Sequence, residues 1–255
     1  MSVNVVCIKW GTKYGSEYVN RLYRGVRKQL SGPFRFVCLT DDANGIDADV
    51  DVQPLPVTPF DEDDFDSRKG GETWRKVGLF QPGLADLAGD TLFLDLDIVL
   101  TGSLDDFFSY QPGRFCVIQD WLEKRRAWMP GRDGRVGNTS VFRFHPEKHR
   151  RVYDHFVDRQ AEVLDSFRIE QQYVSNALAD DLSFWPEQWV LSFKRHCRPM
   201  FPMNMIRTPH QPSEMRILAF HGYPLPQQAI EGYSSSVFKS TKPATWLKQH
   251  WSDAA

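Results

Sequence analysis

The sequence has 255 residues, of which 41% are hydrophobic and 25% charged, and its net charge is −2. These values are typical of a globular protein with a substantial core and argue against bulk electrostatic binding of nucleic acid. No apolar stretch is long enough to span a membrane, so any membrane contact is expected to be peripheral. The cysteines Cys7, Cys38, Cys116 and Cys197 form no CxxC pair, which indicates free thiols in a cytoplasmic protein and no zinc site.

The first half of the chain alternates strand and helix patterns. Buried strands are predicted over residues 3–10, 34–39, 50–55 and 92–100. A helix is predicted over residues 16–30, where apolar residues recur every four positions, and another over residues 72–87. This order predicts an α/β fold with a mainly parallel sheet and right-handed crossovers.

The second half continues this pattern and then becomes rich in proline and aromatic residues. Predicted strands cover 115–118, 139–144 and 216–220, and predicted helices cover 146–161, 170–178 and 244–251. Residues 58–71 and 121–137 are expected to form a solvated loop and a mobile loop. Trp185 and Trp189 could form an acceptor surface or one packed stripe. We expect a single domain, 1–255, with a nucleotide-binding half (1–110) and an acceptor half (111–255).

The most informative stretch is residues 92–100, an apolar run interrupted by Asp95 and Asp97. On a buried strand these two carboxylates would share a face, repel each other and lose hydration. A hard divalent cation such as Mn²⁺ or Mg²⁺ would compensate both effects. The alternative is that the strand ends at Asp95 and both acids are solvated turn residues.

Polar or aromatic residues follow three of the predicted strands directly. Because the carboxyl ends of parallel strands meet at one edge of a sheet, we expect these residues to line a ligand site. They are Trp10, Gly11, Thr12, Asp41, Asp42, Asp95, Leu96 and Asp97. The chain has neither a GxGxxG motif after the first strand nor a GxxxxGK[ST] motif, which disfavours a dinucleotide fold and a P-loop.

With these residues the chain resembles glycosyltransferases of the GT-A type. The likeness is to family 8, which includes glycogenin and bacterial lipooligosaccharide galactosyltransferases. The segments that carry it are TWRKV (73–77), the aspartate strand, GSLDDFF (102–108), GNTSVF (137–142), EQQ (170–172) and AFHG (219–222). Together they extend over most of the chain.

The resemblance implies a GT-A, Rossmann-like mixed sheet and transfer of a hexose from a nucleotide-sugar to a glycan or other hydroxyl acceptor. The donor would be a UDP-sugar, and the anomeric configuration would be retained. It also implies that Asp95, Asp97 and His221 bind Mn²⁺ or Mg²⁺, and that Lys76 and Ser140 contact the donor. Glu170, Gln171 and Asn138 would then act at the sugar.

Four features depart from the family pattern. The ending of the first strand, KWGT (9–12), differs from the family's usual one. Glu170 replaces the usual Asp, Thr139 and Ser140 replace a Ser-Gly step, and no lysine follows His221 closely. The family uses that lysine to hold a donor phosphate, so here Lys76, an arginine or the metal would take over its role. Its absence is the best support for a non-catalytic nucleotide-sugar-binding protein.

A metal-dependent phosphatase of the haloacid dehalogenase type is the other alternative, because it also places a DxD motif after an apolar strand. Its motif normally lies on the first strand, far from the position of Asp95.

Overall fold

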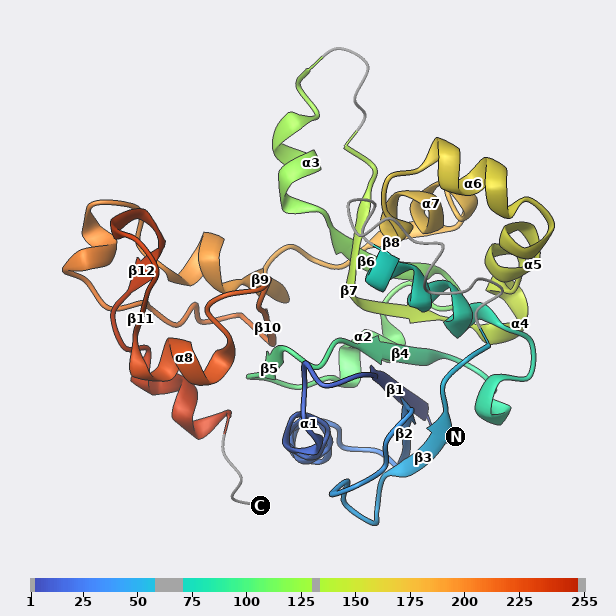
Figure 1. Cartoon of the computed structure of the whole chain (residues 1–255), viewed down its shortest axis with the longest axis horizontal. Helices are drawn as coiled ribbons and strands as arrows, with labels where there is room; N and C mark the ends of the chain where they lie inside the picture. The colour runs from blue at the N-terminus through green and yellow to red at the C-terminus, as the bar shows by residue number, and fades with distance from the viewer. Residues whose placement is uncertain (1–2, 58–70, 130–133, 252–255) are drawn as a thin grey trace.

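The computed structural model describes residues 3–57, 71–129 and 134–251, and a seven-stranded sheet forms its centre (Figure 1). The strand order is β3-β2-β1-β4-β7-β6-β8. The strands are β1 (Val3–Lys9), β2 (Phe34–Thr40), β3 (Asp51–Pro54), β4 (Thr91–Leu94), β6 (Phe115–Gln119), β7 (Gly137–Phe144) and β8 (Leu182–Phe184). Neighbours pair in parallel except for β7, which is antiparallel to both β4 and β6. The predicted α/β fold with a mainly parallel sheet is confirmed.

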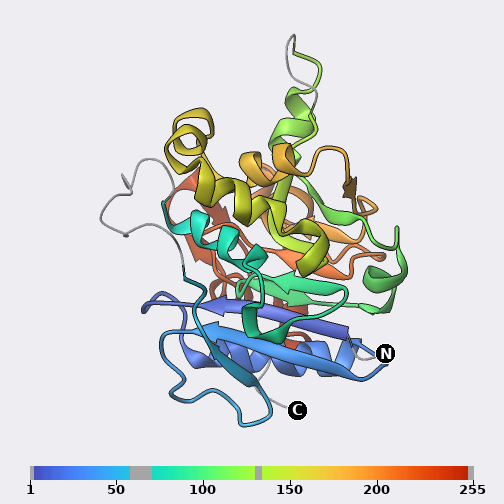
Figure 2. The same cartoon turned by 90° about the vertical axis from the view of Figure 1, so that its right-hand side faces the viewer.

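Helices cover both faces of this sheet (Figures 1 and 2). Helix α1 (Ser16–Gln29) packs on one face and buries Leu22 and Val26 from its apolar stripe. The other face is covered by η3 (Gly71–Phe80), α4 (Pro146–His149), α5 (Arg151–Asp158), α6 (Gln160–Ser166) and α7 (Glu170–Ala177). The sheet therefore separates two apolar cores, and its central strands are buried on both sides, whereas the edge strands β3 and β8 are partly exposed.

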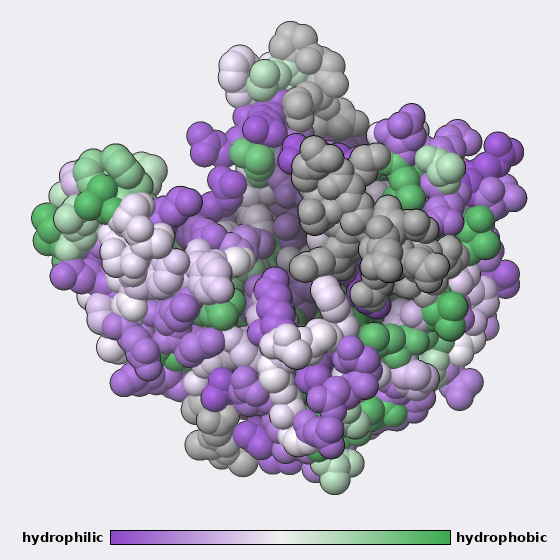
Figure 3. Space-filling model, in the orientation of Figure 1, coloured by the Kyte–Doolittle hydropathy of each residue, from purple (hydrophilic) through white to green (hydrophobic). Residues whose placement is uncertain are grey.

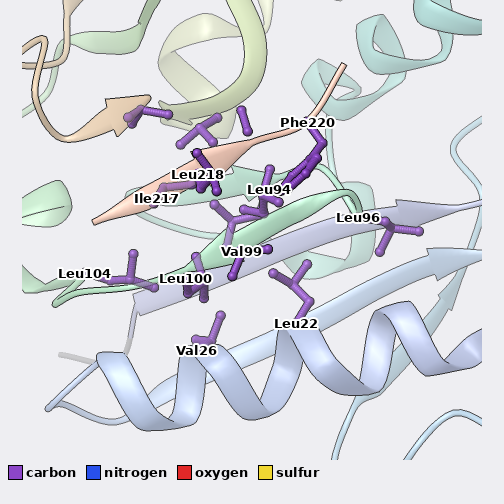
Figure 4. Close-up of a cluster of buried hydrophobic side chains, with 14 of the residues drawn as sticks. Leu22, Val26, Leu94, Leu96, Val99, Leu100, Leu104, Ile217, Leu218 and Phe220 are labelled. Atoms are coloured by element: carbon purple, nitrogen blue, oxygen red, sulfur yellow. The ribbon is translucent and has the colours of Figure 1, made fainter. Parts of the chain in front are cut away.

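The predicted strand 92–100 is wrong as one strand. It is two strands in two different sheets, and residues 95–97 form the turn between them. Strand β4 ends at Leu94, and β5 (Ile98–Leu100) joins a second sheet with β10 (Ile217–Ala219) and β9 (Val190–Ser192). Figure 4 shows Val99 and Leu100 between α1 and β10. Because both halves are fully buried, the apolar pattern contains no signal of the break.

Several helix boundaries also differ from the prediction. Part of the predicted loop 121–137 is a helix, α3 (Trp121–Arg126), because Asp120 Oδ1 accepts hydrogen bonds from the backbone N–H groups of Leu122 and Glu123. The predicted helix 146–161 is divided among α4, α5 and α6. The predicted helix 72–87 is η3 followed by a second short turn, η4 (Leu84–Asp86). Most of the acidic loop 58–71, and residues 130–133, lie outside the described residues.

The C-terminal part forms a lobe beside the second sheet (Figure 1). It contains η5 (Phe193–Cys197), η6 (Met203–Met205), α8 (Pro226–Glu231), β11 (Tyr233–Ser234), η7 (Val237–Lys239), β12 (Ser240–Thr241) and η8 (Thr245–Gln249). The last of these lies within the predicted helix 244–251. Among the described residues, no helix has the length and apolarity needed to cross a membrane.

A buried arginine ties the core to the short helix α2 (Asp105–Ser109). Arg143 on β7 is 0% exposed and donates to the carbonyl oxygens of Phe107 and Gln111 at 2.7 and 2.6 Å. Its guanidinium also lies over the ring of Trp185, 5.7 Å from the centroid. Trp185 stacks in turn on Trp189, so the two tryptophans form the packed stripe that was one of the two alternatives predicted for them.

We predict that Arg143→Ala lowers the free energy of unfolding by about 3 kcal/mol or more, because it removes a fully buried side chain and leaves the buried carbonyl oxygen of Phe107 without its charged donor. Chemical denaturation with urea measures this loss. The control is Arg150→Ala, which removes an exposed pair with Asp154 at 2.9 Å and is expected to cost less than about 1 kcal/mol. Equal losses in the two variants would contradict the role given to Arg143.

Candidate active site

A cavity of about 170 Å³ lies where β1 and β4 end. It is lined by Ile8, Trp10, Lys13, Tyr14, Thr73, Arg75, Lys76, Phe93, Asp95, Leu96 and Asp97. Three segments distant in sequence thus meet there: the end of the first strand, helix η3 and the acidic turn 95–97. The predicted convergence at the strand ends holds for Trp10, Asp95, Leu96 and Asp97, and Lys76 of η3 joins them.

Lys76 and Asp95 form an ion pair at the wall of this cavity. Lys76 Nζ lies 2.8 Å from Asp95 Oδ1 and also donates to the carbonyl oxygen of Thr139 at 2.9 Å. Burial lowers the pKa of Lys76, but the negative charges of Asp95 and Glu170 outweigh it and leave the pKa raised. The lysine is therefore held in its charged form, and η3, the acidic turn and β7 are joined at one ammonium group.

Asp97 is buried deeper than Asp95 in the same turn. Its carboxylate is 9% exposed and accepts a hydrogen bond from the hydroxyl of Tyr14 at 3.0 Å. Burial, together with repulsion from Asp95, raises the pKa of Asp97 to about 7. The prediction that both acids are solvated turn residues is thus wrong for Asp97, although the turn itself exists.

His221 reaches the acidic turn through strand pairing. Ala219 on β10 pairs antiparallel with Ile98 on β5, and the backbone N–H of Phe220 donates to the carbonyl oxygen of Asp97 at 3.2 Å. The ring of His221 packs on Trp121, and its Nε2 is buried without a hydrogen-bond partner. Burial and nearby Lys194 lower the pKa of His221 to about 4, so the imidazole is neutral at physiological pH.

These groups suit a hard divalent cation in their chemistry. Two carboxylates that repel each other and an unpartnered neutral imidazole nitrogen make a donor set that Mn²⁺ accepts. Within the described ranges, however, no three His, Cys, Asp or Glu side chains are grouped closely enough to hold a metal ion. Asp95 and Asp97 lie together in the turn, whereas the His221 ring is joined to it only through the backbone.

Glu170 begins α7 behind the lysine and is 2% exposed. Burial raises the pKa of Glu170 to about 7, against the opposing effects of the Lys76 charge and a hydrogen bond with the Thr139 side chain. Its Oε1 has no hydrogen-bond partner. Glu170 therefore belongs to the same electrostatic cluster as Lys76 and Asp95, as a carboxyl group with one free oxygen.

Strand β7 contains two further residues of the predicted site, Asn138 and Ser140. Ser140 accepts a hydrogen bond from the backbone N–H of Asp95 through its carbonyl oxygen, at 2.9 Å. Asn138 accepts one from the backbone N–H of Ser140, at 3.1 Å. Both residues thus support the acidic turn from the neighbouring strand, and neither lines the cavity.

Asp120 was missed by the sequence analysis. It lies directly after β6, and its Oδ2 accepts a hydrogen bond from Gln171 Nε2 at 3.2 Å. Its charge also acts on His221. The signal that could have identified it is the one used for Asp41 and Asp95, since all three follow directly on a buried strand.

Lys194 was also missed. It lies in η5, and its Nζ donates to the carbonyl oxygen of His221. Burial lowers the pKa of Lys194, and Asp97 acts on it in the opposite direction. This lysine lies about 27 positions before His221 in the sequence, so the spacing of the late motif could not indicate it.

The remaining predicted residues surround the first strand end. The guanidinium of Arg75 lies 4.7 Å from the centroid of the Trp10 ring, and the backbone N–H of Gly11 donates to Asp41 Oδ2 at 3.0 Å. Gly11 has φ +58°, a conformation that glycine adopts without strain. Asp42 accepts from Asn44 in a local turn, and Thr12 is exposed. Apart from Trp10 and Arg75, these residues do not line the cavity.

A second cavity, of about 810 Å³, is larger, but the only charged residues among its lining residues are Glu123 and Arg135. It lies between α3 and α7 and is lined by Glu123, Gly134, Arg135, Val136, Phe167, Gln172, Ser175, Asn176, Ala179 and Leu182. None of the residues predicted for the site lines it. We therefore assign the candidate site to the smaller cavity, where the buried carboxylates and Lys76 meet.

The fold is that of solved glycosyltransferases. Galactosyltransferase LgtC, crystallised with donor and acceptor sugar analogs, matches with a TM-score of 0.63 at 15% identity, over 97% of this chain and 95% of that chain. Mouse xyloside xylosyltransferase 1 in its apo form matches with a TM-score of 0.56 at 9% identity, over 88% and 98% of the two chains. The bifunctional glycosyltransferase WbbM, also in apo form, matches with 0.57 at 10% identity, over 88% and 46%.

No protein-family model and no curated protein sequence matches the chain. The likeness to the solved structures at these identities concerns the fold, and it confirms the GT-A type of architecture predicted from the sequence motifs.

We predict a pH dependence of stability that originates at Glu170. Because its pKa is raised to about 7, the folded protein binds a proton that the unfolded chain releases near pH 4.5. This contribution to the free energy of unfolding is present below pH 4.5 and is lost as the pH rises to about 7, by about 3 kcal/mol. Glu170→Gln should make the decline shallower in denaturation measured from pH 4.5 to 8. Parallel curves for the two proteins would rule out this assignment.

Proposed function

We propose that this protein is a metal-dependent glycosyltransferase that transfers a hexose from a UDP-sugar to a glycan or another hydroxyl acceptor, with retention of configuration. The observation that carries the proposal is the electrostatic cluster at the strand ends: the turn Asp95–Asp97 and buried Glu170 surround the single ammonium of Lys76, beside a cavity. The fold shared with LgtC, which was crystallised with donor and acceptor sugar analogs, supports it.

The donor diphosphate would lie over the mouth of this cavity. Lys13, Arg75 and Lys76 line it and offer positive charge to phosphate oxygens. Lys194 approaches the acidic turn from the opposite segment and would provide the cation that the late motif lacks. Trp10 is already stacked against Arg75 and would offer its other side to the nucleotide base.

Asp95, Asp97 and His221 would hold the metal, for which Mn²⁺ suits the mixed oxygen and nitrogen donors better than Mg²⁺. When bound, the ion would supply positive charge to the leaving diphosphate without a proton transfer. Tyr14 would orient Asp97 through its hydroxyl group, and Lys76 would keep Asp95 ionised. These residues thus prepare the site before the donor arrives.

Glu170 and Gln171 would act on the sugar itself. A carboxylate at Glu170 stabilises positive charge that develops at the anomeric carbon. Although its pKa is about 7 in the free protein, an adjacent cation favours the ionised form. Asp120 accepts from Gln171 and would fix the orientation of this amide, while Asn138 would act through the position of Ser140.

We predict that UDP binds with Mn²⁺ and only weakly in the presence of EDTA, which isothermal titration calorimetry can measure. Asp97→Ala should abolish the metal effect, because it removes the carboxylate that is buried deepest in the turn. His221→Ala should weaken Mn²⁺ binding by about ten- to a hundredfold. Asp154→Ala is the matched control, since this carboxylate is exposed on α5, where it pairs with Arg150. Equal UDP affinity with Mn²⁺ and with EDTA would exclude the metal site.

We also predict that Glu170→Gln lowers kcat by about 10- to 1,000-fold, as expected from losing a few kcal/mol of transition-state stabilisation. UDP release from a panel of UDP-sugars, with and without acceptors, provides the assay. NMR of the first-formed product reads the stereochemistry. A β-linked product from an α-linked donor would refute retention, and UDP-sugar binding without any turnover would favour the non-catalytic alternative.

A further inference from the structure

The C-terminal lobe exposes a cluster of large apolar side chains at its outer end. Figure 3 shows them as the green region at the upper left, over η6 and the turn between β11 and β12. Met200 is 86% exposed and Ile206 71%. The cluster, called here the apolar tip, consists of Met200, Phe201, Met203, Met205, Ile206, Val237 and Phe238. Contiguous exposed apolar surface of this kind indicates an interaction site.

The apolar tip has a fixed internal structure. Asn204, which is 1% exposed, donates through Nδ2 to the carbonyl oxygens of Val237 and Ser240 at 2.9 and 3.1 Å. The rings of Phe201 and Phe238 are in contact, with centroids 4.7 Å apart. Two segments that are more than 30 positions apart in sequence are thus held together by a buried polar side chain. The fold therefore presents these apolar side chains outward together.

The charged residues of the two segments that form the apolar tip are of one sign. Arg207 and Lys239 directly follow its two segments, and no Asp or Glu occurs in residues 188–213 or 232–251. Residues 193–251 contain eight Lys and Arg against two Glu, whereas residues 1–192 contain 23 basic and 30 acidic residues. An anionic surface would therefore attract this lobe and repel the rest of the chain, which fixes the orientation of the molecule.

We infer that the apolar tip docks the protein onto an anionic lipid surface, with its side chains in the headgroup region and its basic residues against lipid phosphates. Turn residues at an outer corner can enter a fluid interface without a complementary partner surface. The combination of inserted apolar residues with flanking Lys and Arg is what such a surface requires. This inference does not depend on the proposed transfer reaction.

Vesicle flotation with the full-length protein tests the inference. We expect binding to phosphatidylcholine vesicles that contain about 30% phosphatidylglycerol, weak binding to pure phosphatidylcholine, and loss of binding at high salt. Replacing Arg207 and Lys239 together by Ala should weaken binding about 25-fold, at about fivefold per base. Met200→Ser with Ile206→Ser should weaken it at least tenfold.

Matched controls separate the apolar tip from general surface effects. Lys28→Ala with Arg27→Ala removes two exposed bases of α1, and Val157→Ser removes an exposed apolar side chain of α5. Both controls should bind the anionic vesicles like the unmodified protein, and all variants should keep its melting temperature.

Two results would overturn the inference. One is failure of the unmodified protein to float with anionic vesicles at low salt. The other is a dimer in sedimentation velocity that Met200→Ser with Ile206→Ser dissociates, because this would assign the apolar tip to a second copy of the chain. Donor binding by calorimetry should be unchanged in every variant of the tip, so this test is separate from the test of the proposed function.

Discussion

The site depends on one ammonium group among three carboxyl groups. Lys76 contacts Asp95 directly, and the charges of Glu170 and Asp97 also act on it. Lys13 and Lys194 add positive charge near Asp97, but these lysines do not balance three acids in a buried setting, and the raised pKa values of Asp97 and Glu170 express this imbalance. The same ammonium binds the carbonyl of Thr139, so it also joins the acidic turn to β7. Lys76 is therefore both the cation that faces the acids and the side chain that joins the acidic turn to β7.

This imbalance explains why folding tolerates the site and why a cation would be favoured there. Asp97 and Glu170 can each hold a proton near neutral pH, which removes most of the repulsion in the free protein. A divalent cation would displace these protons and supply the missing positive charge. Ligand binding would then stabilise the folded state and be favoured by rising pH, because the acids must release their protons.

Sequence patterns alone predicted part of the candidate site, because the residues that follow the strands of a parallel sheet meet at one edge of that sheet. They succeeded for Trp10, Asp95 and Asp97, which line one cavity. The strand before His221 also pairs beside the aspartates, but His221 was indicated only by the family resemblance. Sequence patterns failed where burial hides a break, as between β4 and β5, since an apolar run looks alike in one strand or two. Lys194 could not be predicted either. Its approach to His221 depends on how η5 packs beside β10, which no spacing records.

The C-terminal lobe contributes residues both to the surroundings of His221 and to the apolar tip. Its η5 brings Lys194 to the back of His221, while the segment that directly follows, from Met200 onward, forms the apolar tip. Only a few residues separate the two, so the orientation of the apolar tip on a surface would also determine the orientation of the cavity. A transferase held in this way would meet acceptor hydroxyl groups displayed at the lipid surface in a restricted geometry, which lowers the entropic cost of bringing donor and acceptor together. Docking and acceptor choice would then be coupled through the C-terminal lobe, which contains both Lys194 and the apolar tip.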